Sequence, residues 1–185
     1  MLFIIWVIIG VIALTVGWVV FAFNSLISLK NKTKGAWSDI DVQLKRRYNI
    51  IPNLVEAVKG YATHERGTFE TVARTRARAM AAKTPDEAGD AERGVTGALK
   101  GLFAVAENYP GLRASENFQK LQRSLADTED KIQAARRFYN GNVRDFNTKQ
   151  EHFPYNLVAG LFSFKKVEFF EIEESEERKA PKVTL

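Results

Sequence analysis

Residues 2–23 read LFIIWVIIGVIALTVGWVVFAF, and this stretch decides how the rest of the chain is arranged. No residue in it is charged, and Thr15 is its only conventionally polar side chain. A helix of this length measures about 33 Å, and the hydrocarbon core of a bilayer is about 30 Å thick. All 27 Lys and Arg and all 22 Asp and Glu lie after residue 29. We therefore predict a transmembrane anchor over residues 1–24, followed by a water-exposed body.

A cleaved signal peptide is the main alternative for this leader. Such a peptide needs a basic beginning, an apolar core of about 7–15 residues and a cleavage site of small residues. Here no Lys or Arg precedes the apolar stretch, the stretch is too long, and no Ala-x-Ala sequence follows it. These features favour an anchor that stays attached.

Positive charge follows the predicted span closely. Lys30, Lys32 and Lys34 come first, and residues 45–47 read KRR. Flanks rich in Lys and Arg stay on the cytoplasmic side of a membrane. The sequence therefore predicts a single-pass protein of the cell inner (cytoplasmic) membrane, with its body in the cytoplasm and its N-terminus outside. The first three lysines are the candidate contacts for lipid headgroups.

Small residues share one face of the predicted span. Gly10, Ala13 and Gly17 lie at positions i, i+3 and i+7 of a helix. Small side chains let a second spanning helix approach closely, so this face is a candidate for self-association. The alternative is that Gly and Ala are simply frequent in membrane spans.

The body has the apolar spacing of helices. A first stripe advances in steps of three and four and is nearly continuous with the span, which predicts one long helix leaving the bilayer as a stalk. Its members are Trp37, Ile40, Leu44, Tyr48, Ile51, Val55 and Val58. Pro52 interrupts this stripe, so we expect a kink near residues 48–52 but not necessarily an end.

Three further stripes follow. Phe69, Val72 and Met80 indicate a short helix. The next apolar stripe covers residues 91–106, after a break at residues 84–86. The last stripe covers residues 118–146 and keeps its phase through the turn-like sequence at residues 140–142. The predicted fold is all-α: an N-terminal transmembrane helix followed by an antiparallel bundle of long helices over residues 25–164.

Two features lie towards the end of the chain. Asn140 and Asn147 are seven residues apart on one helix face, and an Asn on a bundle seam sets helix register. Surface exposure is the alternative. Residues 165–185 are predicted to be an extended and partly disordered tail, whose strand-like residues 167–172 could pair with a neighbouring copy.

Composition excludes several kinds of chemistry. The chain has no Cys, and its two histidines, His64 and His152, lack the spacing of a zinc site. We find no phosphate loop and no nucleophile elbow, so we predict no catalytic residue, no metal, no cofactor and no small-molecule substrate. The net charge of +5 could attract nucleic acid, but no nucleic-acid-binding motif is present. Membrane lipid is the partner that we expect, although a plain solvated basic face is the simplest interpretation.

Several segments resemble the LemA family of bacterial membrane proteins. They read FNSL (23–26), WSDIDVQLKRR (37–47), IPNLVEAVKGYA (51–62), AENYPGLRA (106–114) and ARRFYN (135–140). The resemblance covers residues 23–170 in order, with Asn49 and Arg113 departing from the usual Asp and Lys. It implies an N-terminal anchor, a bundle of long antiparallel helices and a family that includes proteins of magnetosome membranes. It implies no enzymatic activity, since the family has no established catalytic residues.

These observations predict a protein that acts by assembly. We expect a membrane-anchored, homo-oligomeric scaffold that organises the membrane or partner membrane proteins without chemistry of its own. The alternative is a monomeric accessory module that binds a membrane enzyme or protease. A membrane-bound hydrolase would require a catalytic set, and we find none in the sequence.

Overall fold

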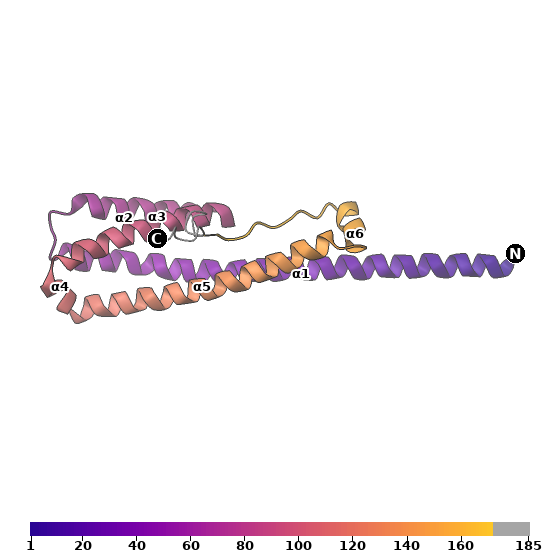
Figure 1. Ribbon diagram of the computed structural model, residues 1–185, viewed down its shortest axis with the longest axis horizontal. Coiled ribbons are helices and arrows are strands. Elements are labelled where there is room, and N and C mark those ends of the chain that lie inside the picture. The colour runs from indigo at the N-terminus through magenta and orange to yellow at the C-terminus, as the bar shows by residue number, and fades with distance from the viewer. Residues whose placement is uncertain (172–185) are drawn as a thin grey trace, which may run out of the picture.

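The computed structural model describes residues 1–171, and all of the secondary structure within them is helical. The six helices are α1 (Leu2–Lys59), α2 (Arg66–Ala81), α3 (Pro85–Glu107), α4 (Pro110–Ala114), α5 (Glu116–Glu151) and α6 (Tyr155–Leu161). The two long helices α1 and α5 run antiparallel in close contact, and the α2–α3 hairpin packs alongside them (Figure 1). This arrangement confirms the predicted all-α class and the antiparallel bundle.

Helix α1 joins the apolar leader to the bundle without a break. Its 58 residues correspond to a rod of about 87 Å. Residues 2–17 are exposed, and from Ala22 onwards one face of the helix is buried. The expected stalk is therefore continuous, but it is not bare. Helices α5 and α6 cover it down to the end of the apolar leader, because α6 reaches as far as Trp18.

Pro52 lies inside α1 and does not end it, as the apolar stripe predicted. A proline has no N–H, so the carbonyl of the residue four positions earlier, Tyr48, has no intrahelical donor. The structure satisfies this carbonyl from another helix, because Nε of Arg76 in α2 donates a hydrogen bond to the Tyr48 oxygen at 2.7 Å. The proline thus helps to fix α2 against α1.

The apolar stripes form one main core. It includes Ile40, Leu44 and Leu54 of α1, Leu102 of α3 and Ile132 of α5. The stripe of α2 is shifted relative to the prediction, because Ala79 is buried and Met80 is 55% exposed. The expected inward role of Met80 is therefore wrong. A small side chain at position 79 suits the closely packed α2–α3 contact.

Local sequence explains where α3 and α5 begin. Thr84 caps α3 by accepting the N–H of Glu87, whose carboxylate in turn accepts the N–H of Thr84, and Pro85 occupies the first turn. Ser115 occupies the N-cap position of α5, but its side chain makes no capping hydrogen bond. Helix α5 continues through Gly141, which confirms that residues 140–142 do not form a turn.

After α6 the chain turns back along the bundle in an extended conformation (Figure 1). We call residues 165–171 the strap. It runs along α5 towards the N-terminal end of α3, and Phe170 near its end is fully buried. The rest of the tail, residues 172–185, lies outside the described residues, and so does the disorder expected there.

Candidate membrane and assembly surfaces

The predicted self-association face is open in the isolated chain. Among the described residues only α1 is long and apolar enough to cross a membrane. Gly10, Ala13 and Gly17 are exposed and lie within an arc of about 60° at 100° per residue. A Cβ built at Gly10 or at Gly17 would meet no atom of the chain within 4 Å. No part of the described bundle folds back onto this surface.

The three juxtamembrane lysines lie close to the end of the apolar stretch. Lys30 and Lys34 are about 10 Å and about 16 Å beyond Phe23 along the helix axis. Lys32 and Lys34 are exposed, whereas Lys30 is half-buried and its Nζ lies 5.8 Å from the centre of the Phe164 ring. Contact of these lysines with lipid headgroups stays a prediction.

Arg47 does not belong to this basic flank. It lies about 36 Å beyond Phe23, several times the screening length of about 8 Å in physiological salt. Its side chain is only 5% exposed and is paired inside the bundle. Arg47 therefore does not face lipid although it follows the positive flank in the sequence, because its side chain joins helices.

Arg47 belongs to a buried polar cluster at the centre of the bundle. Its Nη1 lies 2.9 Å from Oε2 of Glu92 in α3 and 2.8 Å from Oε2 of Glu129 in α5. Its Nη2 donates a hydrogen bond to Oγ1 of Thr96 at 3.2 Å, and the Tyr48 hydroxyl donates to the other oxygen of Glu92. The cluster therefore connects α1, α3 and α5.

Burial decides the protonation behaviour of this cluster. Glu92 is fully buried, and loss of hydration raises the pKa of its carboxyl although Arg47 and Tyr48 oppose the shift. Burial, reinforced by the negative charge of Glu92, also raises the pKa of the Tyr48 hydroxyl. The cluster joins three helices through Arg47, although Nε of Arg47 is buried without a hydrogen-bond partner among the described residues and the Glu129 side chain is 37% exposed.

Asn140 and Asn147 both bind the strap. Asn147 accepts the N–H of Val167 at 3.0 Å and donates to its carbonyl at 2.9 Å. Asn140 accepts the N–H of Phe170 at 2.9 Å and donates to its carbonyl at 3.1 Å. The two residues predicted as a pair are thus brought together in one site. A role in register between helices or subunits stays a prediction.

An aromatic pocket completes the attachment of the strap. The buried Phe170 ring lies 5.4 Å from the ring centre of Trp37, which itself lies 5.5 Å from that of Tyr139. The Tyr139 hydroxyl donates to the carbonyl of Glu168 at 2.8 Å, and burial raises the pKa of Tyr139 to about 12. At the end of the strap, the carbonyl of Glu171 lies so close to Gly89 that a Cβ there would overlap it.

The structure also places the two histidines, and it adds one residue, Glu92, that the sequence did not single out. His64 follows the far end of α1 and His152 follows α5, and no group of three metal-binding side chains occurs within residues 1–171. Glu92 was not predicted, although it lies in helical phase with Ala88, Val95 and Leu99 and so stands out as a carboxylate on an apolar face.

The chain is similar to known proteins over most of its length. The LemA family profile matches residues 36–185. The chain is 24% identical over 175 residues to Magnetosome protein MamQ 2 of Paramagnetospirillum magneticum, covering 80% of this chain and 64% of that protein. It is 28% identical over 171 residues to Protein LemA of Metamycoplasma hominis, covering 88% of this chain and 77% of that one.

A second magnetosome protein extends this comparison. Magnetosome protein MamQ of Magnetospirillum gryphiswaldense is 23% identical over 174 residues, covering 80% of this chain and 64% of that protein. The chain thus spans somewhat less than two thirds of the length of these magnetosome relatives. The family profile covers most of this chain, including the α1, α3 and α5 residues that meet in the buried polar cluster. The chain therefore belongs to the LemA family.

Proposed function

We propose that this protein is a membrane-anchored scaffold without catalytic chemistry, which self-assembles and organises the membrane or partner membrane proteins. The observation that carries the proposal is the open small-residue face of the span. Gly10, Ala13 and Gly17 are exposed, and a Cβ built at either glycine would meet no atom of the described chain within 4 Å. Spanning helices associate through faces of this kind, because small side chains allow close backbone contact without any hydrophobic driving force.

The proposed orientation places the bundle in the cytoplasm and the N-terminus outside, in the inner membrane. The positive flank supports this orientation, and Lys30, Lys32 and Lys34 lie within about 16 Å of the end of the apolar stretch. In this position they attract the anionic headgroups of the cytoplasmic leaflet. The residues of the KRR sequence are too distant to contribute.

The central polar groups support a structural role for the bundle. Arg47 pairs with both Glu92 and Glu129 and so joins three helices; the Glu129 side chain is 37% exposed, whereas Glu92 has no exposed surface. A reacting molecule would need access to such groups. We therefore propose a structural role for the bundle.

Self-association through the span can be tested with two matched substitutions. Gly17→Ile places a large side chain on the small-residue face, whereas Thr15→Ile does so on roughly the opposite face, about 160° from Gly17. The full chain is purified in a mild detergent and its particle mass is measured over a range of concentrations. We expect wild type and Thr15→Ile to form the same oligomer and Gly17→Ile to dissociate.

A strict monomer at every concentration would contradict the scaffold. Cross-linking in cells then separates the two functions, because self-adducts support a scaffold and adducts with another membrane protein support an accessory module. An oligomer that survives Gly17→Ile would show instead that assembly uses a different surface.

A further inference from the structure

A second segment of this chain has the character of a membrane contact. Residues 153–164 read FPYNLVAGLFSF and contain no charge, whereas His152 precedes them and Lys165 and Lys166 follow. Four large apolar side chains of this segment point into solvent: Phe153 (79% exposed), Leu157 (63%), Leu161 (73%) and Phe162 (48%). Helix α6 thus packs one face on the chain and leaves another apolar face uncovered.

The position of α6 along α1 places this exposed apolar face beside the end of the membrane span. Its inner residues Val158 and Ala159 pack on Ala22 and Leu26 of α1 in a small core of their own. The ring of Tyr155 lies 5.9 Å from that of Trp18. Trp18 is about 7.5 Å inside the C-terminal end of the apolar stretch, so α6 lies beside the last turns of the span and not above them.

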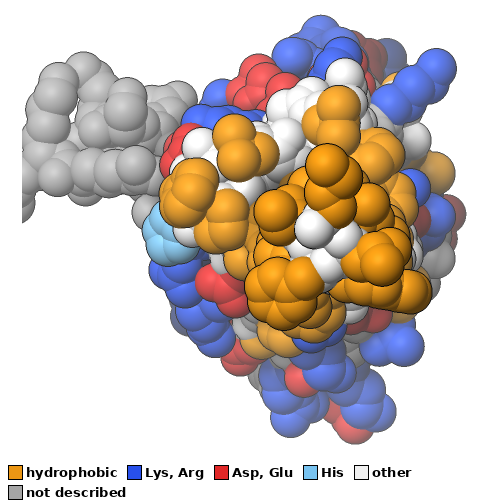
Figure 2. Space-filling view, turned by 90° about the vertical axis from the view of Figure 1, so that its right-hand side faces the viewer, with side chains coloured by type: hydrophobic (Ala, Val, Ile, Leu, Met, Phe, Trp, Pro, Cys, Tyr) orange, Lys and Arg blue, Asp and Glu red, His pale blue; other side chains and the backbone are white. Residues whose placement is uncertain are grey.

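The shape of this end of the molecule agrees with a membrane surface. Viewed along the long axis from the N-terminus, hydrophobic side chains gather around the leader, and Lys, Arg, Asp and Glu side chains lie around them in the view (Figure 2). The nearby cations include Lys149, which donates to Oγ of Ser25 at 2.7 Å and lies 4.6 Å from the centre of the Tyr155 ring. Cations around an apolar surface are typical of a protein face in the headgroup region.

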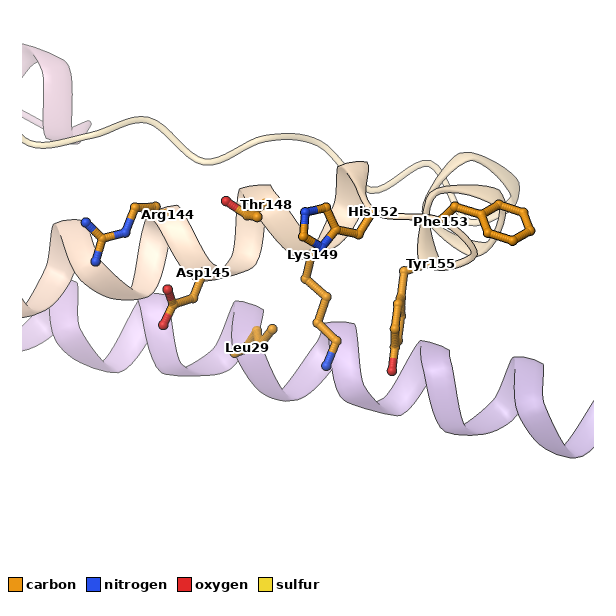
Figure 3. A pocket seen from close by; sticks show the side chains of 8 residues that line it. All are labelled: Leu29, Arg144, Asp145, Thr148, Lys149, His152, Phe153 and Tyr155. Atoms are coloured by element: carbon orange, nitrogen blue, oxygen red, sulfur yellow. The ribbon is translucent and has the colours of Figure 1, made fainter.

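A shallow pocket of about 600 Å³ lies at this border. Arg144, Lys149 and His152 line it from the polar side, and Phe153 and Tyr155 line it from the apolar side (Figure 3). Lys149 and Tyr155 both extend towards α1. Asp145 also lines the pocket, so Arg144 and Lys149 are the groups that a phospholipid phosphate would contact, and the aromatic rings would contact its acyl chain.

The length of the segment decides how it meets the bilayer. An uncharged stretch of about 10–14 residues is too short to span and is typical of a core helix or of an interfacial segment. The exposure of Leu157 and Leu161 excludes a core helix within the described chain. Interfacial helices bury their apolar face by about 5–10 Å, which matches the depth given by Trp18.

We propose that α6 and its flanking residues 153–164 form a second membrane contact, which lies in the interface of the same leaflet that the end of the span crosses and binds its phospholipids. This inference rests on the proposed membrane anchoring of α1. Two contacts fix the bundle more firmly than one, because a single span can rotate about its own axis whereas a span and an adjacent embedded helix cannot do so freely.

The absence of Cys makes a direct test possible, because every introduced cysteine is unique. Leu161→Cys and, separately, Leu157→Cys are labelled with a nitroxide in the full chain, reconstituted in vesicles of phosphatidylcholine with some phosphatidylglycerol. Collision with oxygen, which partitions into lipid, is compared with collision with a water-soluble nickel chelate. Val20→Cys in the span is the lipid reference, and Met80→Cys in α2 is the matched exposed apolar control, since these side chains are 53% and 55% exposed.

We expect the oxygen-to-nickel ratio at positions 157 and 161 to exceed that at position 80 several-fold and to approach that at position 20. A ratio at both positions equal to that at position 80, with position 20 still in lipid, overturns the interfacial contact and leaves the anchor intact. A water-exposed label at position 20 overturns the anchor and this inference together. Because both leucines are exposed, their replacement does not disturb the core.

Discussion

Asn140 and Phe170 exchange two hydrogen bonds, the same pair that two opposite residues exchange in an antiparallel sheet. Asn147 and Val167 repeat the arrangement. The two spacings match, because seven residues of α-helix rise about 10.5 Å and three extended residues cover about 10 Å. A helix thereby holds an extended strap through its side chains, without a neighbouring strand.

Replacing these amides should lower stability. In Asn140→Leu and Asn147→Leu, a part-buried N–H and carbonyl of the strap lose their partners, and each such group costs about 1–3 kcal/mol. An Asn on a bundle seam behaves in the opposite way, because Leu at such a position raises stability. Thermal unfolding in detergent distinguishes the two roles. Asn142→Leu is the control, because the Asn142 amide bonds only to its own helix, at the Phe138 carbonyl. A higher melting temperature for Asn147→Leu would favour the seam.

Two glycines of α3 should respond to alanine with opposite signs. Ala in place of Gly within a helix normally stabilises by up to about 1 kcal/mol. Gly97 has nothing within 4 Å of a Cβ, so Gly97→Ala should gain this amount. At Gly89 the new Cβ would overlap the Glu171 carbonyl, and the end of the strap must move. We expect Gly89→Ala to lower the unfolding free energy and to speed hydrogen exchange at the Phe170 amide. Equal gains at both positions would show that the strap does not pack there.

The hydrogen bond from Arg76 to Tyr48 should depend on Pro52. Arg76→Ala leaves the Tyr48 carbonyl without a donor, at a cost of about 1–3 kcal/mol. In a Pro52→Ala background, the restored N–H of residue 52 can bond to that carbonyl within the helix, so the same Arg76→Ala change should cost much less. A double-mutant cycle by denaturant unfolding measures this coupling. Additive effects would mean that Arg76 acts elsewhere.

Glu92 gives the bundle a defined dependence on pH. Burial raises its pKa in the folded chain above the ordinary value of 4.5, so the folded state binds the proton more readily than the unfolded state. Its contribution to stability is therefore fully present below pH 4.5 and is lost as the pH rises through the folded pKa. Relative to Glu92→Gln, the wild type should gain stability when the pH falls from 7 to 5, measured by denaturant unfolding at each pH.

A difference that shrinks on acidification would indicate instead that Arg47 dominates and lowers the pKa of Glu92. Glu92→Ala is the complementary variant. It removes the acceptor of the Tyr48 hydroxyl and one partner of Arg47, and breaking a buried pair in this way costs about 3–5 kcal/mol.

The sequence predicts those parts of this fold that follow a local period. The apolar stripes of α1, α3 and α5 identify helices whose inward faces are buried, and the phase of the last stripe correctly carries α5 through Gly141. Met80 and Ala79 show the limit of this reasoning, since the choice between neighbouring positions depends on how closely α2 approaches α3.

Contacts between distant residues escape such reasoning. Asn140 and Asn147 can be assigned to one face, but their partners lie 30 and 20 residues away in a segment without periodicity. The sequence alone places Arg47 among surface charges, because its partner Glu92 lies 45 residues further along the chain. The sequence also does not predict the exposed face of α6, because an apolar stretch does not show which of its side chains the rest of the chain covers.

The unbroken course of α1 makes the molecule a lever. About 54 Å of the rod lies beyond Phe23, so a change of 10° in the tilt of the leader swings the far end by about 9 Å. Helices adjust their tilt when they enter bilayers of different thickness. In the proposed membrane placement, a change in bilayer thickness would therefore displace Lys59 at the far end of the rod.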